Sequence, residues 1–250
     1  HYLKVLQGPW VDDPTNENRE YDRVRIRHLL KLLGEEGITA SVLTETAKRL
    51  ARARDGLTLR LADVAGRLCS DAPLGQVWIE RDGFAVLDEE TQLRMLTAAL
   101  CYVASAEYQP RAASSEALLE QVLSGRGGTL HGAEVIIEKA HLRVVREERA
   151  VSATVADQGE LWDGQWVLTD LHGPLREGAV VRALGDDGWQ QIPDRSGITV
   201  PFRAARSLPA LWSSGSLLAC PGVGFGPEVA ATRYVLGRVD TGFEAFCLSH

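Results

Sequence analysis

Apolar residues recur at helical spacing through the first part of the chain. A first series lies on one arc of a predicted helix that Asn16 or Asn18 can cap, because a short side-chain oxygen accepts from the free amides of a first turn. It contains Ile26, Leu29, Leu30 and Leu33. A second series begins after Thr39, another candidate cap, and ends near Cys69. It contains Leu43, Ala47, Leu50, Leu57, Leu61, Val64 and Leu68. The spacing predicts two successive helices, each with one buried face.

The middle of the chain mixes strand-like and helical patterns. Two short apolar runs, 77–81 and 84–87, flank Asp82-Gly83 and predict a hairpin, because Asp-Gly supplies the positive φ angles of a tight turn. Two helices and two strands should follow it. They are expected at about 88–105, 114–123, 134–138 and 141–146, with Asp88 capping the first.

Beyond residue 150 the pattern changes to short strands separated by turn signals. Residues 150–159 are small and polar, and we interpret them as a linker. The turn signals after it are Asp163-Gly164, Gly173-Pro174, Asp187-Gly188 and Ser196-Gly197. This punctuation is typical of a small β-rich domain. The sequence therefore predicts an α+β fold, in which a helical linker and a helix-rich α+β domain precede a smaller β-rich domain.

The formal net charge is −7, but the positive charge is concentrated in one stretch. Residues 19–60 contain ten Lys and Arg against six Asp and Glu, a local balance of +4. Six of these cations fall together at helical spacing. They are Arg23, Arg27 and Lys31 on the first predicted helix and Lys48, Arg49 and Arg52 on the second. Such an edge can bind phosphates, although the same pattern is typical of a solvated helix face.

Other candidate chemistry is weaker. The four cysteines form no C-x-x-C pair, which favours buried thiols in a reducing compartment over a metal or disulfide framework. His131 has no His or Cys partner at ligand spacing, so we expect no metal site. Tryptophans of the C-terminal part can stack bases or anchor a small core. They are Trp162, Trp166, Trp189 and Trp212. No apolar run is long enough to span a membrane.

Four motifs resemble those of one known family. Asp13-Pro14-Thr15-Asn16, with Tyr21 and Arg23-Val24-Arg25-Ile26-Arg27, is similar to the D-x-S/T-N, aromatic, R-x-x-I-R signature of the tRNA(Ile)-lysidine synthetases. Val24 departs from that signature, since many members carry Asn there. Three later strings resemble, in order, the tail of alphaproteobacterial-type members. They are T-L-H-G at 129–132, R-V-V-R-E at 143–147 and L-W-D-G-Q-W at 161–166.

The resemblance implies a cytoplasmic ligase of the ATP-pyrophosphatase group. Such an enzyme uses ATP, with magnesium, to attach lysine to the wobble cytidine of tRNA(Ile) with a CAU anticodon. The family's S-G-G-x-D-S phosphate loop does not occur in the sequence, which opens at His1. We therefore expect the C-terminal part of a longer enzyme. We expect that part to be inactive alone and to bind ATP at most through the domain it lacks.

The resemblance also implies roles for individual residues. Arg23 and Arg27 would support catalysis, and Asp13 and Asn16 would order the turn behind them, unless these two serve only as turn and cap residues. The expected tRNA-backbone contacts are Lys31, Lys48, Arg49 and Arg52. The expected parts are 1–34, the tail of and linker from the ATP-binding domain; 35–150, a tRNA-recognition domain; and 158–250, the β-rich domain. The alternative is a non-catalytic module for dimerisation or partner binding, and a homodimer is possible in either case.

Overall fold

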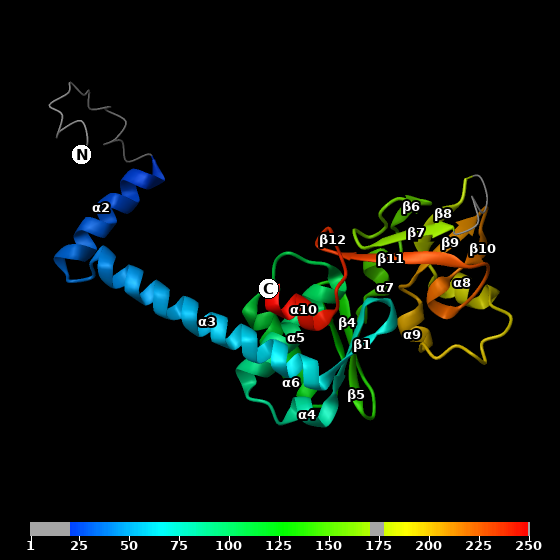
Figure 1. The fold of residues 1–250 in the computed structure, drawn as a ribbon, viewed down its shortest axis with the longest axis horizontal. Helices are drawn as coiled ribbons and strands as arrows, with labels where there is room; N and C mark the ends of the chain where they lie inside the picture. Colours follow the sequence, from blue (N-terminus) through cyan, green and yellow to red (C-terminus); the bar gives the residue numbers. More distant parts are fainter. Residues whose placement is uncertain (1–20, 171–177, 250) are drawn as a thin grey trace, which may run out of the picture. The chain divides into compact units, whose positions relative to one another are not determined.

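The computed structural model describes residues 21–170 and 178–249 (Figure 1). By compactness the chain divides into two units, His1–Gly56 and Leu57–His250. The described part of the first unit consists of helix α2 (Asp22–Glu35) and the beginning of helix α3 (Ala40–Leu68). Helix α3 passes Gly56 without interruption, so the two predicted helices are confirmed.

The connection between the two helices follows from local chemistry. Gly37 has a φ of +85°, and the Ile38 N–H donates to Leu33 O over 2.9 Å, which closes the end of α2. Thr39 Oγ1 then accepts from the Val42 N–H at 3.3 Å and caps α3, as predicted. The predicted caps of α2, Asn16 and Asn18, lie outside the described residues.

The expected buried faces are only partly formed. Ile26 and Leu29 are 55% and 54% exposed, and Val24 is the buried residue of α2. On α3 the predicted stripe is exposed at Leu50 (66%) but buried at Leu61 and Val64. The prediction was therefore wrong for α2 and for the first half of α3, because no described element covers those apolar side chains.

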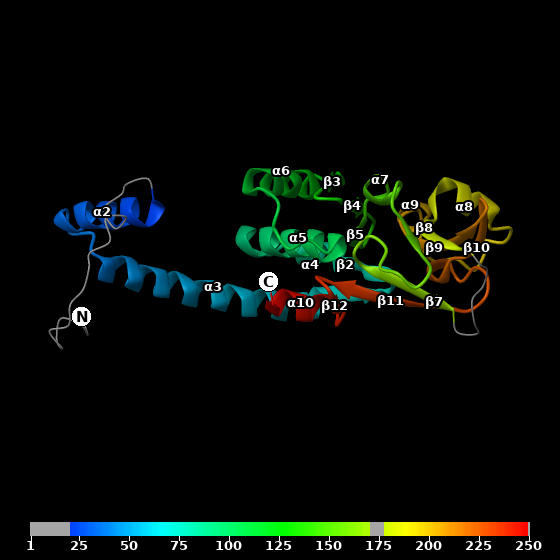
Figure 2. The ribbon, with the colours of Figure 1, turned by 90° about the horizontal axis from the view of Figure 1, so that it is seen from above.

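The first core of the second unit is built on a five-stranded antiparallel sheet in the order β1-β2-β5-β4-β3. Its strands are β1 (Cys69–Ala72), β2 (Gln76–Glu80), β3 (Gly128–Leu130), β4 (Ala133–Ile137) and β5 (His141–Arg146). One face carries the fully buried Val77, Ile79 and Val144. Helices α5 (Glu89–Ala104) and α6 (Ala112–Leu123) cover it, and α10 (Phe243–Ser249) lies beside α5 (Figure 2). The four elements expected between 88 and 146 are thus confirmed.

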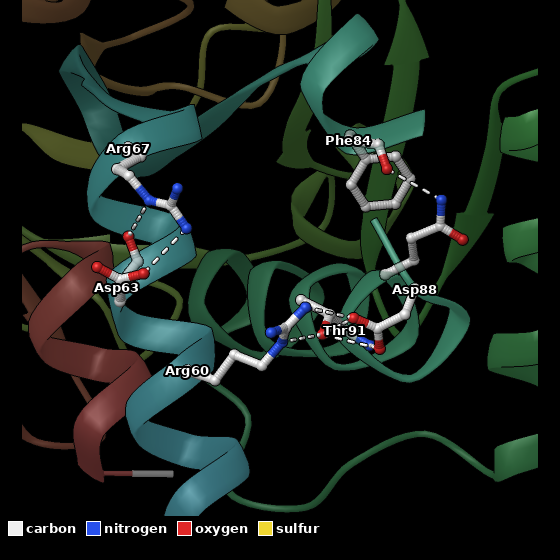
Figure 3. A network of polar contacts seen from close by, with 7 residues as sticks. Arg60, Asp63, Arg67, Phe84, Asp88 and Thr91 are labelled. Atoms are coloured by element: carbon white, nitrogen blue, oxygen red, sulfur yellow. Dashed lines mark hydrogen bonds and ion pairs between the residues drawn. The ribbon is translucent and has the colours of Figure 1, made fainter. Parts of the chain in front are cut away.

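Asp88 fixes the start of α5 and ties it to α3. Its Oδ1 accepts from the Thr91 N–H at 3.0 Å, and Arg60 of α3 donates to Asp88 Oδ2 at 2.6 Å and to Thr91 Oγ1 at 3.1 Å (Figure 3). Hydrogen bonds from the Thr91 hydroxyl and N–H hold the pKa of Asp88 below its usual value. The cap predicted from sequence is therefore part of a contact between two helices.

The hairpin predicted around Asp82-Gly83 is wrong. Strand β2 is followed by the short helix α4 (Arg81–Ala85), because β1 and β5 already occupy both hydrogen-bonding edges of β2. Phe84 is thereby buried in the core, with 1% exposed. A Cβ at Gly83 would lie 2.6 Å from Leu68 Cδ2, so this glycine permits close packing and does not form a turn.

The C-terminal part of the second unit contains two further antiparallel sheets, in the orders β10-β9-β8-β6 and β12-β11-β7. The strands are β6 (Val155–Asp157), β7 (Trp166–Asp170), β8 (Val180–Ala183), β9 (Pro209–Ser213), β10 (Ser216–Ala219), β11 (Val229–Val235) and β12 (Arg238–Val239). The helices are α7 (Glu148–Val151), α8 (Gly185–Gln191) and α9 (Phe202–Ala205), with the 3-10 turn η3 (Pro221–Val223); a second 3-10 turn, η2 (Pro73–Gly75), lies between β1 and β2. The predicted α+β class is confirmed.

The stretch interpreted as a linker, 150–159, has regular structure. It includes the end of α7, where Val151 is fully buried, and strand β6, which pairs with β8. Of the turn signals, Asp163-Gly164 forms a turn with both φ angles positive, whereas Asp187-Gly188 lies inside α8. Gly173-Pro174 lies outside the described residues. The division into domains near this stretch stays a prediction.

Phe84 and Val86 distinguish helix α4 from the hairpin. In a strand the two side chains would share one face, but here Phe84 is buried and Val86 is 84% exposed. We expect Phe84→Ala to lower the free energy of unfolding by about 3–5 kcal/mol. Val86→Ala should change it by less than about 0.5 kcal/mol. Urea unfolding followed by circular dichroism measures both, and similar losses for the two variants would contradict α4.

Candidate nucleic-acid interface

The six predicted phosphate-binding cations are all exposed on the helices of the first unit. Arg23, Arg27 and Lys31 lie at i, i+4 and i+8 of α2 and form one edge of that helix. Lys48, Arg49 and Arg52 are exposed on the first half of α3. The structure thus places each set on its own helix, in the pattern that the sequence predicted. Asp13 and Asn16 lie outside the described residues.

These cations differ in how far they are already neutralised. Lys48 Nζ lies 3.0 Å from Glu45 Oε1, and Arg23 is stacked on Tyr21 with 5.4 Å between the guanidinium carbon and the ring centroid. Within the described ranges, no ion pair is formed by Arg23, Arg27, Lys31, Arg49 or Arg52. Five positive charges therefore remain available to an anion.

Neighbouring arginines, by contrast, are already paired with carboxylates. Arg25 is paired with Asp22, and Arg54 Nη2 lies 2.8 Å from Asp55 Oδ1. Further along α3, Arg67 Nη2 lies 2.9 Å from Asp63 Oδ2. All these pairs are exposed, so each contributes little to stability but does cancel local charge. The capacity to bind an anion therefore belongs to particular residues and not to every cation of the basic stretch.

The three later motifs, T-L-H-G, R-V-V-R-E and L-W-D-G-Q-W, all lie in the second unit. They meet in one polar network around Arg146, which belongs to R-V-V-R-E. Its Nε and Nη2 each donate to one carboxylate oxygen of Asp163 at 2.8 Å, and its Nη1 donates to Gly132 O at 2.5 Å. Asp163 belongs to L-W-D-G-Q-W and Gly132 to T-L-H-G, so this single guanidinium joins all three motifs.

The network continues into the last strands of the chain through Gln165. Gln165 donates to Asp163 Oδ2 at 2.9 Å and accepts from Arg233 Nη2 at 3.0 Å. Arg233 also donates to Asp240 Oδ2 at 2.7 Å and to the carbonyl of Tyr102 at 2.6 Å. The Tyr102 hydroxyl donates to the same Asp240 oxygen at 2.7 Å. Helix α5 is thereby tied to strand β11.

The Asp240 carboxyl shows the electrostatic effect of this arrangement. Burial by itself raises its pKa, but hydrogen bonds from the Tyr102 hydroxyl and the Gly242 N–H and the charge of Arg233 outweigh burial. The pKa of Asp240 therefore lies below its ordinary value, and the carboxylate is the form that the fold stabilises.

His131 lies in a turn, and three of the C-terminal tryptophans are core residues. His131 and Gly132, with φ angles of +59° and +75°, make the two-residue turn between β3 and β4. Trp162, Trp166 and Trp212 are each less than 10% exposed, so they are core anchors and cannot stack a base. Within the described ranges no group of His, Cys, Asp or Glu is arranged to hold a metal ion.

Two of the four cysteines have thiols that are less reactive than a free thiol, because burial disfavours the thiolate form. Burial raises the pKa of Cys101 to about 11 and that of Cys220 to about 12.

No helix within the described residues has the length and apolar character needed to cross a membrane.

Several known proteins similar to this chain share a name. No family model matches the chain. The tRNA(Ile)-lysidine synthase of Ruegeria pomeroyi is 33% identical over 249 residues, which cover 100% of this chain and 58% of that protein. The proteins of the same name from Wolbachia pipientis and Brucella anthropi are 25% and 28% identical over 90% and 84% of the chain. The chain spans about half the length of these curated relatives.

The similarity to the protein from Ruegeria pomeroyi extends along the whole chain. The chain therefore belongs to the tRNA(Ile)-lysidine synthase family, and it corresponds to a portion of those longer proteins. The resemblance stated from the sequence motifs is thereby confirmed.

We expect Asp240→Asn to lower the free energy of unfolding by about 3–5 kcal/mol at pH 7, because it leaves the buried Arg233 charge unbalanced. A lowered carboxylate pKa stabilises the fold above the unfolded pKa of about 3.9, and this contribution is lost as the pH falls through the folded pKa. The deficit of the variant should therefore shrink below about pH 4. Urea midpoints from pH 3 to 8 measure it.

Asp157→Asn, the same substitution at an exposed position of β6, is the matched control and should have little effect at any pH. Equal stability of the Asp240 variant and the wild type at pH 7 would show that the network contributes nothing to the fold.

Proposed function

We propose that this chain is the tRNA-recognising part of an ATP-dependent ligase that attaches lysine to the wobble cytidine of tRNA(Ile) with a CAU anticodon, forming lysidine. The observation that carries the proposal is the similarity over the whole chain to proteins named for that product. The unpaired cations of α2 and α3 support it, because RNA binding requires positive charge free of internal partners.

In this reaction ATP first adenylates the base oxygen and releases pyrophosphate, and the lysine ε-amine then attacks the activated carbon while AMP leaves. Negative charge gathers on phosphates, which fixed guanidinium groups stabilise. We assign this supporting role to Arg23 and Arg27, and phosphate contacts to tRNA to Lys31, Lys48, Arg49 and Arg52. ATP and magnesium would be bound by the remainder of the whole protein, because the chain has neither the S-G-G-x-D-S string nor, in its described residues, a metal cluster.

A second function is favoured by a separate observation. Ile26, Leu29, Leu43 and Leu50 are apolar and between 41% and 66% exposed, and such a surface is typical of a protein contact. A non-catalytic module for dimerisation or partner binding would use these side chains. It predicts association that depends on protein concentration and no dependence of tRNA affinity on Arg27 or Arg52.

Salt dependence tests the tRNA-binding function. We expect the logarithm of the affinity for tRNA to fall with the logarithm of salt concentration, with a slope of roughly 0.7–0.9 for each phosphate contact. Arg27→Glu and Arg52→Glu should each weaken binding and reduce this slope by about one contact. Filter binding or fluorescence anisotropy between 50 and 200 mM salt measures both quantities.

Arg67→Glu is the matched control, because it makes the same charge change on α3 at an arginine already paired with Asp63. It should leave the slope unchanged. In the whole protein, Arg23→Ala and Arg27→Ala should slow ligation. Unaltered affinity, slope and turnover in Arg27→Glu, with only the thermal stability changed, would favour a structural role for this arginine.

The chain alone should not carry out the ligation. Incubation of residues 1–250 with ATP, lysine and tRNA(Ile) should release no AMP above background, because no phosphate loop holds the nucleotide. The whole protein under the same conditions is the positive control. Turnover by the chain at the rate of the whole protein would mean that its own residues contain the catalytic machinery.

A further inference from the structure

Trp78 lies on the face of the five-stranded sheet opposite to α5 and α6. The neighbouring residues of β2, Val77 and Ile79, are fully buried toward the helices, so Trp78 points the other way. The strand register places it opposite Arg143 of β5 on one side and Ser70 of β1 on the other. Trp78 is half-buried and Ser70 is exposed.

One face of the indole ring is already occupied. The Arg143 guanidinium carbon lies 4.1 Å from the centroid of the Trp78 ring. Because Arg143 is the neighbour on the β5 side, the other ring face is turned toward β1, where Ser70 has a small side chain. The residue directly opposite Trp78 on that side therefore presents no large side chain to the ring.

The ring is also held in a fixed orientation. Arg143 is 6% exposed and donates to both carboxylate oxygens of Glu138, at 2.7 and 3.2 Å, and to Gln76 Oε1 at 3.2 Å. The Trp78 Nε1–H donates to the same Gln76 oxygen at 3.3 Å. The guanidinium and the indole thus share one acceptor, and the stack forms without a ligand. Little side-chain entropy is lost when a second ring binds.

The surroundings favour a nucleic acid over an apolar partner. The His141 ring lies 6.2 Å from the Trp78 ring, and Lys139, in the turn just before it, is exposed. No ion pair of Lys139 is found in the part of the chain that the structure describes. Aromatic side chains commonly stack unpaired bases, and an exposed lysine in the turn leading into β5 can contact RNA phosphate.

We propose that Trp78, backed by Arg143, is a platform on which an unpaired nucleobase of the bound RNA stacks, with Lys139 near its phosphate. The proposal rests on the proposed function, since it assumes that the chain binds tRNA. It names a contact that differs from the cations of α2 and α3 in chemistry. Stacking depends weakly on salt, whereas phosphate contacts depend on it strongly.

The test uses hexaadenylate as a single-stranded probe and tRNA(Ile) as the natural one. Trp78→Ala should weaken hexaadenylate binding by about 5- to 100-fold, the usual range for removing one stacked base. Trp78→Phe should retain most of the affinity, because phenylalanine also offers a ring face. Binding of a short RNA duplex should be unaffected, because its bases are paired and stacked with each other.

Trp189 provides the matched control. It is also half-buried, but its neighbours are Phe202, with 5.3 Å between ring centroids, and Arg195 at 5.6 Å. Trp189→Ala should leave hexaadenylate affinity unchanged. If Trp78→Ala fails to fold, tryptophan fluorescence decides the question: hexaadenylate should quench a component in the wild type that is absent from folded Trp78→Phe.

The outcomes separate this proposal from the proposed function. Wild-type hexaadenylate affinity in folded Trp78→Ala, or identical quenching in the wild type and Trp78→Phe, would overturn the platform, even if the salt slope of tRNA binding still responds to Arg27→Glu. Absence of any tRNA binding by the wild type would overturn the proposed function and the platform with it. Loss of hexaadenylate binding in Trp78→Ala with the salt slope of tRNA binding preserved would support both.

Discussion

A guanidinium removed from water must be paired, and two such groups, on Arg146 and Arg233, determine how the second unit is put together. Their side chains are 20% and 5% exposed. Leaving a buried charge without its partner costs about 3–5 kcal/mol, so every group around them is constrained by the others. The backbone is constrained as well: a Cβ at Gly132 would lie 2.2 Å from Arg146 Nη1, and one at Gly75 would lie 2.3 Å from Arg233 Nε.

This constraint explains what the later family motifs do. T-L-H-G provides a turn and a carbonyl, R-V-V-R-E provides the guanidinium, and L-W-D-G-Q-W provides the carboxylate and two core tryptophans. These groups belong to two sheets and hydrogen-bond to one another, so they are not available to bind a ligand. These three motifs therefore stabilise the fold. The side chains proposed to contact RNA lie outside them and are the unpaired cations of α2 and α3 and the ring of Trp78.

The local part of this fold was predictable from sequence, and the long-range part was not. Thr39 and Asp88 were recognised as caps because capping depends on a few neighbouring residues. The hairpin at Asp82-Gly83 failed because the pairing of β2 depends on β5, more than sixty residues away. The Tyr102–Asp240 contact likewise joins residues 138 positions apart, which no periodicity reports. Trp78 was missed for the same reason, since only the register with β5 places Arg143 under its ring.

The charge distribution gives a physical reason why stacking and charge would be used together. Residues 61–250 carry a net charge of −9, so most of the second unit repels a polyanion at long range. Repulsion of this kind is screened over about 8–10 Å at physiological salt. At contact distance it affects the affinity less than the direct interactions that the surface forms, such as stacking. A neutral indole gains affinity from base stacking without needing positive potential. An acidic region can therefore take part in RNA binding through a few aromatic side chains, as proposed for Trp78.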